Sequence, residues 1–275
     1  MSHNAEILTL ISLIVYAAAA LAYGLIWIKT TKILKILSPV ILCAGLAVNL
    51  FQLVSRWIDT SQPPFKTLYE SLVLLAACIA LVYLTVELVY RARILGMPSA
   101  AGSAGAMLYA YLDRAKESVN LPPALQSGWF IPHVVVYFFG YAALFVAFGA
   151  SVIYIIRPKP IVIRRPDLVE GQSIDLERLL NGAVRFGFAL LTAGLLVGAV
   201  WAKAAWGDYW TWDPKETWSM VTWFIFAAYI HLYGMKKWRG KKLAWLVIIG
   251  FGAVMFTYLG MNLLPTAEQS IHVYQ

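Results

Sequence analysis

A tryptophan-rich polar segment separates two long apolar stretches in the second half of the chain. Between Trp206 and Trp218 the sequence reads Trp-Gly-Asp-Tyr-Trp-Thr-Trp-Asp-Pro-Lys-Glu-Thr-Trp. Exposed indoles forgo the favourable burial of a large aromatic side chain unless something covers them. So many aromatic residues in one short loop predict a shelf for a flat apolar ligand. The residues of this predicted shelf are Trp206, Gly207, Tyr209, Trp210, Trp212, Asp213, Pro214, Lys215, Glu216 and Trp218.

Three of the four histidines indicate what that ligand could be. His133 begins one apolar stretch and His272 follows the last one, so both flank the shelf. Neutral imidazole is a strong iron ligand, and an apolar shelf with an axial histidine on each side is what a haem requires. We therefore predict His133 and His272 as iron ligands. His231, deep in an apolar stretch, is a further candidate because an ionisable group is costly there.

Simpler explanations exist for the same residues. Tryptophan is enriched at membrane interfaces in general, so the segment could be an ordinary aromatic belt. A single interfacial histidine is often a solvated surface group, and His231 could be a neutral ring bonded to a neighbouring helix carbonyl. Asp213, Pro214 and Glu216 also form a capping box at a helix start. Capping does not account for the crowding of tryptophans.

The elements that must position these residues are membrane helices. Hydrophobic residues make up 61% of the 275 residues and charged residues 13%. This composition excludes a soluble domain of this size. Apolar runs long enough to cross about 30 Å of hydrocarbon predict an all-α polytopic protein with about eight spans. They lie near residues 7–28, 36–55, 68–90, 94–112, 133–156, 183–202, 217–235 and 243–264, the fourth diluted by glycine and proline.

The distribution of basic residues predicts the orientation. Sixteen of the 22 Lys and Arg residues follow the first, third, fifth and seventh spans, and the other six lie on the opposite side. By the positive-inside rule, both termini and the shelf then face outward. The net charge of +8 is explained by this topology and by anionic lipid headgroups, with no need for nucleic acid.

The remaining segments predict a simple organisation. We expect one membrane domain over 1–275, an outer haem-binding loop at 203–217 and a cytoplasmic linker at 157–182 that turns amphipathic after residue 173. Residues 1–6 lack the basic residues of a cleavable signal peptide. Cys43 and Cys78 have no Cys-x-x-Cys spacing and are interpreted as buried packing residues. The chain has no Cys-x-x-Cys-His of its own, so it does not carry covalent haem.

These motifs resemble the CcsA (ResC) family of cytochrome c biogenesis proteins. The tryptophan-rich segment is similar to the signature of that family, and the similarity extends over most of residues 129–275. Earlier residues match only in their helices and in Tyr69-Glu70-Ser71. The supporting motifs are Pro132-His133-Val134, Gly140-Tyr141-Ala142, Tyr229-Ile230-His231 and the stretch from Tyr258 to Leu264. The spacing after Pro265 departs from the compact His-Ser-Tyr that usually ends the family.

The resemblance implies a component of a cytochrome c synthase in the bacterial cytoplasmic membrane, with the thylakoid membrane as the alternative. It implies haem b, bound without a covalent link and as substrate, with His133 and His272 as outer ligands. It also implies a CcsB (ResB)-like membrane partner that completes an inner site at His231, and apocytochrome c as the acceptor. Lys203, Lys215 or Arg56 could meet the haem propionates.

Three other functions remain open from the sequence. Within the same family, the chain could deliver haem to a haem chaperone. A b-type electron-transfer subunit would keep its haem permanently, but it would show paired histidines at matching depths. A secondary transporter would show repeated spans or broken midplane helices. Neither pattern is evident.

Overall fold

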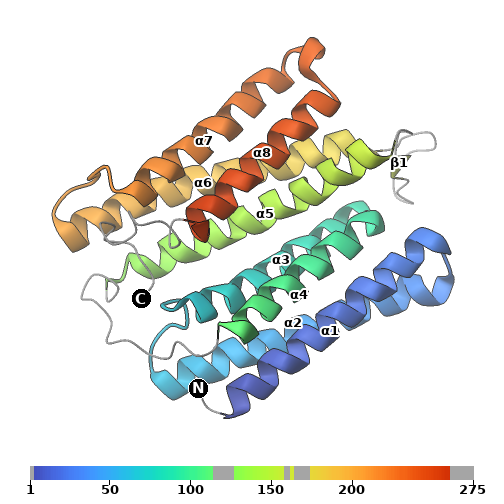
Figure 1. Cartoon of the computed structure of the whole chain (residues 1–275), viewed down its shortest axis with the longest axis horizontal. Helices are drawn as coiled ribbons and strands as arrows, with labels where there is room; N and C mark the ends of the chain where they lie inside the picture. Colours follow the sequence, from blue (N-terminus) through green and yellow to red (C-terminus); the bar gives the residue numbers. More distant parts are fainter. Residues whose placement is uncertain (1–2, 114–126, 158–161, 164–173, 261–275) are drawn as a thin grey trace. The chain divides into compact units, whose positions relative to one another are not determined.

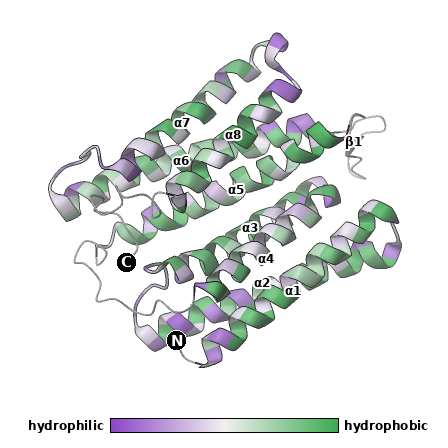
Figure 2. Cartoon of the chain, viewed as in Figure 1, coloured by the Kyte–Doolittle hydropathy of each residue, from purple (hydrophilic) through white to green (hydrophobic). Residues whose placement is uncertain are grey.

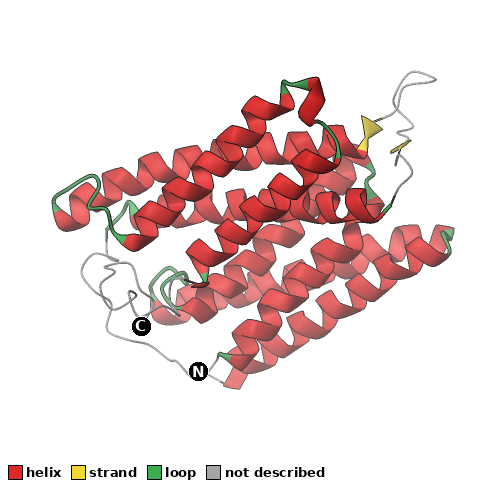
Figure 3. Ribbon diagram, turned by 45° about the horizontal axis from the view of Figure 1, so that its top comes forward, coloured by secondary structure: helices red, strands yellow, loops and turns green. Residues whose placement is uncertain are grey.

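The computed structural model describes residues 3–113, 127–157, 162–163 and 174–260, and these are almost entirely α-helical (Figures 1 and 3). Two 3₁₀ turns, η1 (Arg93–Leu95) and η3 (Lys236–Trp238), and a pair of two-residue strands, β1 (Val162–Ile163) and β2 (Ile174–Asp175), accompany the helices. The helices are α1 (His3–Ile28), α2 (Lys32–Thr60), α3 (Leu68–Tyr90), α4 (Gly96–Leu112), α5 (Phe130–Ile156), α6 (Leu176–Trp206), α7 (Pro214–Tyr233) and α8 (Lys241–Tyr258).

Six helices of the described chain are long and apolar enough to cross a membrane. These are α1, α2, α3, α5, α6 and α8. Figure 2 shows hydrophobic residues along the helices and hydrophilic residues at the α1–α2 and α7–α8 turns. The protein is therefore an all-α polytopic membrane protein, as predicted. α4 has only 17 residues, and α7 has 20 but opens on a polar turn, so these two lie outside the set.

Helix contacts divide the chain into two compact units. In the first unit α1 packs on α2 and α4, and α3 packs on α4 and α2. In the second unit α5 packs on α6 and α8, and α7 packs on α8 and α6. This subdivision has no counterpart in the single membrane domain predicted for 1–275.

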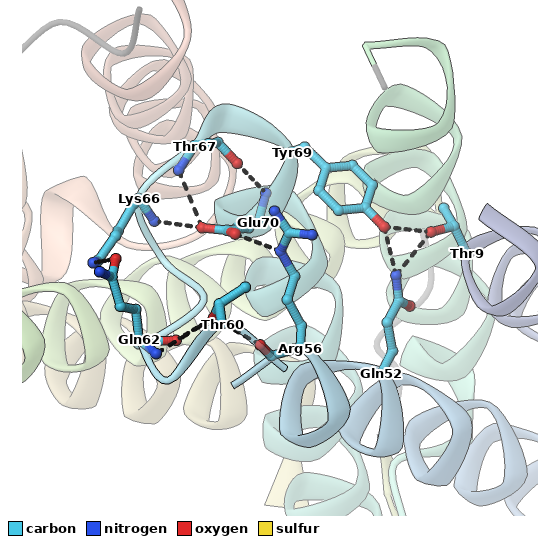
Figure 4. Close-up of polar contacts among 9 residues, drawn as sticks. All are labelled: Thr9, Gln52, Arg56, Thr60, Gln62, Lys66, Thr67, Tyr69 and Glu70. Atoms are coloured by element: carbon cyan, nitrogen blue, oxygen red, sulfur yellow. Dashed lines mark hydrogen bonds and ion pairs between the residues drawn. The ribbon is translucent and has the colours of Figure 1, made fainter. Parts of the chain in front are cut away.

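A buried carboxylate stabilises the start of α3 in the first unit. Thr67 and Glu70 form a capping box, in which each side chain accepts a hydrogen bond from the backbone of the other. Glu70 also accepts a hydrogen bond from the backbone amide of Lys66 at 2.9 Å and pairs with Arg56 at 2.5 Å (Figure 4). Arg56 is thus held by a carboxylate of its own unit, which weakens its candidacy as a propionate partner.

Further buried polar groups lie along the helices of the first unit. Gln52 donates to the Thr9 hydroxyl at 2.8 Å and to the Tyr69 hydroxyl at 2.7 Å (Figure 4). Near the end of α3, the buried Glu87 accepts hydrogen bonds from Tyr23 and from Tyr83, the latter at 2.8 Å. Its second carboxylate oxygen lies 3.1 Å from the Arg93 guanidinium. Buried charges are tolerated when they are paired in this way.

Two details differ from the sequence prediction. α6 begins at Leu176, inside the predicted linker 157–182, because Asp175 caps the helix by accepting from the Arg178 amide at 2.6 Å. The amphipathic stretch and the span predicted at 183–202 are therefore one continuous helix of 31 residues. Cys78 is buried, as predicted, but Cys43 is exposed on α2, so its interpretation as a buried residue was wrong.

A glycine pair in α4 provides a test of packing in the first unit. A Cβ atom on Gly96 would lie 2.2 Å from the buried Tyr23 ring, whereas one on Gly105 would meet nothing within 4 Å. We expect Gly96→Ala to destabilise the protein by about 1–3 kcal/mol through overpacking. Gly105→Ala should be neutral or stabilising by up to about 1 kcal/mol, because alanine favours helix. Thermal unfolding of the purified protein in detergent measures both, and equal shifts would contradict the close contact.

Candidate functional site

His133 lies in the first turn of α5, with its ring against the backbone of α6. Its Nδ1 atom is 3.0 Å from the carbonyl oxygen of Gly194. The ring centroid is 5.3 Å from that of Trp201 with an interplanar angle of 33°, and 4.9 Å from that of Tyr137. Since a carbonyl oxygen only accepts, the Nδ1 atom must carry the hydrogen. In the neutral ring the lone pair that can bind a metal is then on Nε2.

Aromatic contacts connect His133 to the beginning of the tryptophan-rich segment. Trp201 is buried near the end of α6 and contacts Phe130 at 5.5 Å and Trp206 at 4.8 Å between ring centroids. Trp206 is the last residue of α6 and the first of the predicted shelf. The structure thus connects His133 through Trp201 to Trp206, the first residue of the shelf, within one unit.

The shelf loop begins at a glycine that ends α6. Gly207 has φ +92°, a left-handed conformation typical of a helix C-cap, and its amide donates to the Lys203 carbonyl. The Lys203 ammonium donates to the Gly207 carbonyl at 2.5 Å and lies 5.5 Å from the centroid of the Tyr209 ring. Lys203 is therefore held over the exposed aromatic side of the loop, where it could meet an anionic group of a ligand.

The loop ends at the capping box predicted from the sequence. Asp213 accepts from the Lys215 amide at 2.8 Å, Pro214 occupies the first helical position, and Glu216 completes the box. Glu216 extends further back, because its Oε2 atom accepts from the Thr211 amide at 2.8 Å and from the Asp213 amide at 3.3 Å. One carboxylate thus ties the loop on both sides of Trp212.

Trp212 has an unusual backbone conformation that presents its indole outward. Its φ is +60°, a left-handed value that costs roughly 1–2 kcal/mol in a residue other than glycine. Its side chain is 66% exposed, and its ring meets Trp210 edge to face at 6.0 Å. Backbone strain maintained by surrounding hydrogen bonds is characteristic of functional sites. The arrangement keeps a large apolar surface available to a ligand.

The other shelf residues occupy different surroundings. Tyr209 is 60% exposed, whereas Trp218 meets Phe256 of α8 edge to face at 4.4 Å. Three ring contacts involve tryptophans of this region. These are Trp206 with Trp201, Trp210 with Trp212, and Trp218 with Phe256.

The ammonium of Lys215, a residue of the predicted shelf, has a lowered pKa. The residue precedes the predicted span at residue 217 and is half-buried in the first turn of α7. Desolvation lowers the pKa of its ammonium to about 8, although the Asp213 carboxylate opposes the shift. A lysine of this kind can exchange its proton at mildly alkaline pH, so Lys215 is a candidate acid or base within the shelf.

The two other candidate histidines lie away from this arrangement. His231 is exposed in the last turn of α7, where its carbonyl accepts from the Gly234 amide, about 25 Å along the helix from Pro214. It lies at the far end of α7 from the shelf, beside the basic turn that follows. His272 lies outside the described residues. Among the described residues, no group of three or more His, Cys, Asp or Glu side chains could hold a metal ion.

The residues of α6 that contact the His133 ring were not predicted from the sequence. Gly194, Gly198 and Trp201 lie on successive turns of α6 and contact the His133 ring or leave room for it. The small residues at 194 and 198 follow the small-xxx-small pattern of close helix packing. That pattern could have indicated a close neighbour, but not which residue of α5 fills the space.

Comparison with known proteins identifies the family. The family model described as Cytochrome C assembly protein matches residues 65–267. The chain belongs to this family. The cytochrome c biogenesis protein CcsA of Prochlorococcus marinus (strain MIT 9301) is 40% identical over 240 residues, covering 78% of this chain and 77% of that protein. The CcsA protein of Chlorella vulgaris is 36% identical over 259 residues, with 81% of each chain covered.

A solved structure shares the fold of this cytochrome c assembly protein. The Cytochrome c Heme Lyase CcmF is similar with a TM-score of 0.67 and 17% identity over 92% of this chain. This chain spans 46% of the length of that protein. The matched family region includes His133, His231 and the whole tryptophan-rich segment. It also begins next to the Glu70 capping box of the first unit.

The backbone of Trp212 gives a testable consequence for this family member. Because Trp212 has positive φ, we expect Trp212→Gly to be more stable than Trp212→Ala by about 1 kcal/mol. Tyr209 is similarly exposed without a positive φ, so at that position alanine should be at least as stable as glycine. Thermal unfolding in detergent compares the four variants. The same glycine-to-alanine order at both positions would show that the loop adopts another conformation.

Proposed function

We propose that this chain binds haem at the outer membrane face and presents it for covalent attachment to apocytochrome c. The family assignment supports a role in cytochrome c biogenesis. The single observation that carries the proposal is the placement of His133. Its Nδ1 atom lies 3.0 Å from the Gly194 carbonyl oxygen, and Trp201 connects its ring to Trp206 at the start of the loop. A histidine that donates through Nδ1 ligates iron through Nε2.

The proposed topology has eight spans. α4 and α7 cross together with the six apolar helices, because eight crossings place most basic residues on one side of the membrane. Both termini and the shelf loop then face outward, and the segment between α5 and α6 is cytoplasmic. The membrane is the cytoplasmic membrane of a bacterium, with the thylakoid membrane as the alternative.

Haem b is the substrate in this proposal, and the shelf holds it without a covalent bond. His133 is one axial ligand and His272 is the second. The exposed rings of Tyr209 and Trp212 offer apolar surface to the porphyrin, and Lys203 is available to a propionate carboxylate. Holding the porphyrin in one orientation supplies most of the catalysis, because it converts an encounter of two molecules into a reaction within a complex.

The acceptor is a Cys-x-x-Cys-His segment of apocytochrome c. Its histidine replaces one axial ligand, and each cysteine thiol adds across one vinyl group of the haem. In each addition a carbon–sulfur bond forms, the S–H bond breaks and the hydrogen goes to the other vinyl carbon, so no group leaves. Lys215 and Glu216 are the groups of this chain placed to exchange that proton.

His231 is proposed as an inner haem ligand on the path from the cytoplasmic side. It is exposed on α7 in the part of the chain that the structure describes. A CcsB-like membrane partner would supply the second ligand there. The chain and its partner together would then move haem from the inner to the outer site.

Absorption spectra of the purified protein test the outer site. We expect His133→Ala and His272→Ala to lose most bound haem and to regain it when imidazole is added, because free imidazole can fill the vacated ligand position. His3→Ala is the matched control and should leave the spectrum unchanged. Unaltered spectra in both outer variants would refute the proposed ligands. Loss of folding in both, without rescue by imidazole, would favour a structural role for these histidines.

Transfer to an acceptor peptide separates this function from its rivals. We expect a peptide containing Cys-x-x-Cys-His to take haem from the purified complex with its partner and to form thioether bonds, seen as a blue shift of the reduced α band. A peptide with serine in place of both cysteines has no thiols, so it should produce no shift of the α band. A b-type electron-transfer subunit would keep its haem with both peptides.

A further inference from the structure

The His133 ring occupies a space that exists only because residue 198 is glycine. A Cβ atom on Gly198 would lie 2.6 Å from Cε1 and 2.7 Å from Nδ1 of the imidazole, and 3.7 Å from Nε2. The first two distances are far below ordinary contact between carbon or nitrogen atoms. The α6 backbone at Gly198 therefore forms one wall of the position that the imidazole occupies.

The same ring edge is anchored one helical turn earlier. The Gly194 carbonyl accepts the Nδ1 hydrogen of His133 at 3.0 Å, on the edge that faces Gly198. A Cβ atom on Gly198 would be much nearer Nδ1 than Nε2, so it would obstruct the hydrogen-bonded side of the ring. Any methyl group there must displace the ring from the carbonyl.

The remaining neighbours leave the ring little room to shift. The centroid of the Trp201 ring lies 5.3 Å from that of His133, with the two planes tilted by 33°, and Tyr137 makes an edge contact at 4.9 Å. Trp201 and Tyr137 are both buried, and Trp201 is itself packed between Phe130 and Trp206. A displaced imidazole must therefore rotate about its χ1 or χ2 angle, which changes the direction of the Nε2 lone pair.

We propose that Gly198 is a positioning residue for the haem-binding histidine, acting together with the Gly194 carbonyl. This inference rests on the proposed function, because it assigns to His133 the role of an iron ligand. Gly198 admits the ring, and the carbonyl holds the hydrogen on Nδ1 and directs Nε2. Groups that orient a metal-binding histidine typically affect affinity about 10–100-fold when they are lost.

The chain contains a matched control for the packing cost of the substitution. Gly187 lies in the same helix, and a Cβ atom there would come within 2.7 Å of Leu144 of α5. Gly187→Ala therefore strains the same helix pair at a similar distance without touching His133. Gly252→Ala, where an added Cβ atom meets nothing within 4 Å, is the neutral control.

The test measures haem binding and its absorption spectrum in the full chain with its partner. We expect Gly198→Ala to weaken haem binding by about 10–100-fold and to alter the spectrum in the direction of His133→Ala, with recovery on addition of imidazole. Gly187→Ala should lower thermal stability without altering the spectrum. Loosened packing of α5 on α6 would affect both variants, so it cannot by itself explain a changed haem spectrum in Gly198→Ala and an unchanged one in Gly187→Ala.

A double variant shows whether Gly198 acts through His133. In the His133→Ala background the obstructed ring is absent, so adding Gly198→Ala should cause no further loss of haem, and the two effects should be strongly non-additive. Equal losses from Gly198→Ala in both backgrounds would overturn the inference, as would an unchanged spectrum in Gly198→Ala. If His133→Ala itself leaves the spectrum unchanged, the proposed function fails instead.

Discussion

The close approach of α5 and α6 is the constraint on which the candidate site depends. Gly140 and Gly187 face each other across this contact, where a Cβ atom on Gly187 would come within 3.2 Å of the Gly140 carbonyl oxygen. The same closeness continues toward the shelf, where Gly194 packs on Tyr137 and Gly198 on His133. Without side chains on these glycines, the α6 backbone can bind the imidazole directly. A helix carbonyl can accept the hydrogen bond of the imidazole without any additional polar side chain being buried in the membrane bundle.

Most of the fold could be predicted from hydrophobic runs, because a bilayer requires long apolar helices with satisfied backbones. α3 was predicted at residues 68–90, as the structure has it. The boundaries failed where polar residues continue a helix beyond the hydrocarbon, as at Leu176, where α6 starts before its apolar run. The capping box at Asp213 was predictable because it is local in sequence. The setting of His133 was not, since it depends on which turn of α6 lies opposite α5.

The two units differ in how they hold polar groups. In the first unit the buried carboxylates Glu70 and Glu87 are each paired with an arginine and further hydrogen bonds, at opposite ends of α3. Such pairs are costly to break but contribute modest net stability. In the second unit the rings of Tyr137 and Trp201 contact His133, and the Gly194 carbonyl lies at hydrogen-bond distance from its Nδ1 atom.

The backbone of the tryptophan-rich loop is held by hydrogen bonds while the indole of Trp212 stays exposed. A ligand platform must stay open until its ligand arrives, yet open indoles at a membrane surface tend to fold back onto apolar neighbours. Here the hydrogen bonds of one carboxylate, Glu216, and the helix start at Pro214 hold the backbone around Trp212. The strain at Trp212 is local, whereas the bonds that maintain it are shared with the cap of α7. The residues that cap the start of α7 therefore also fix the backbone around Trp212, whose indole is exposed.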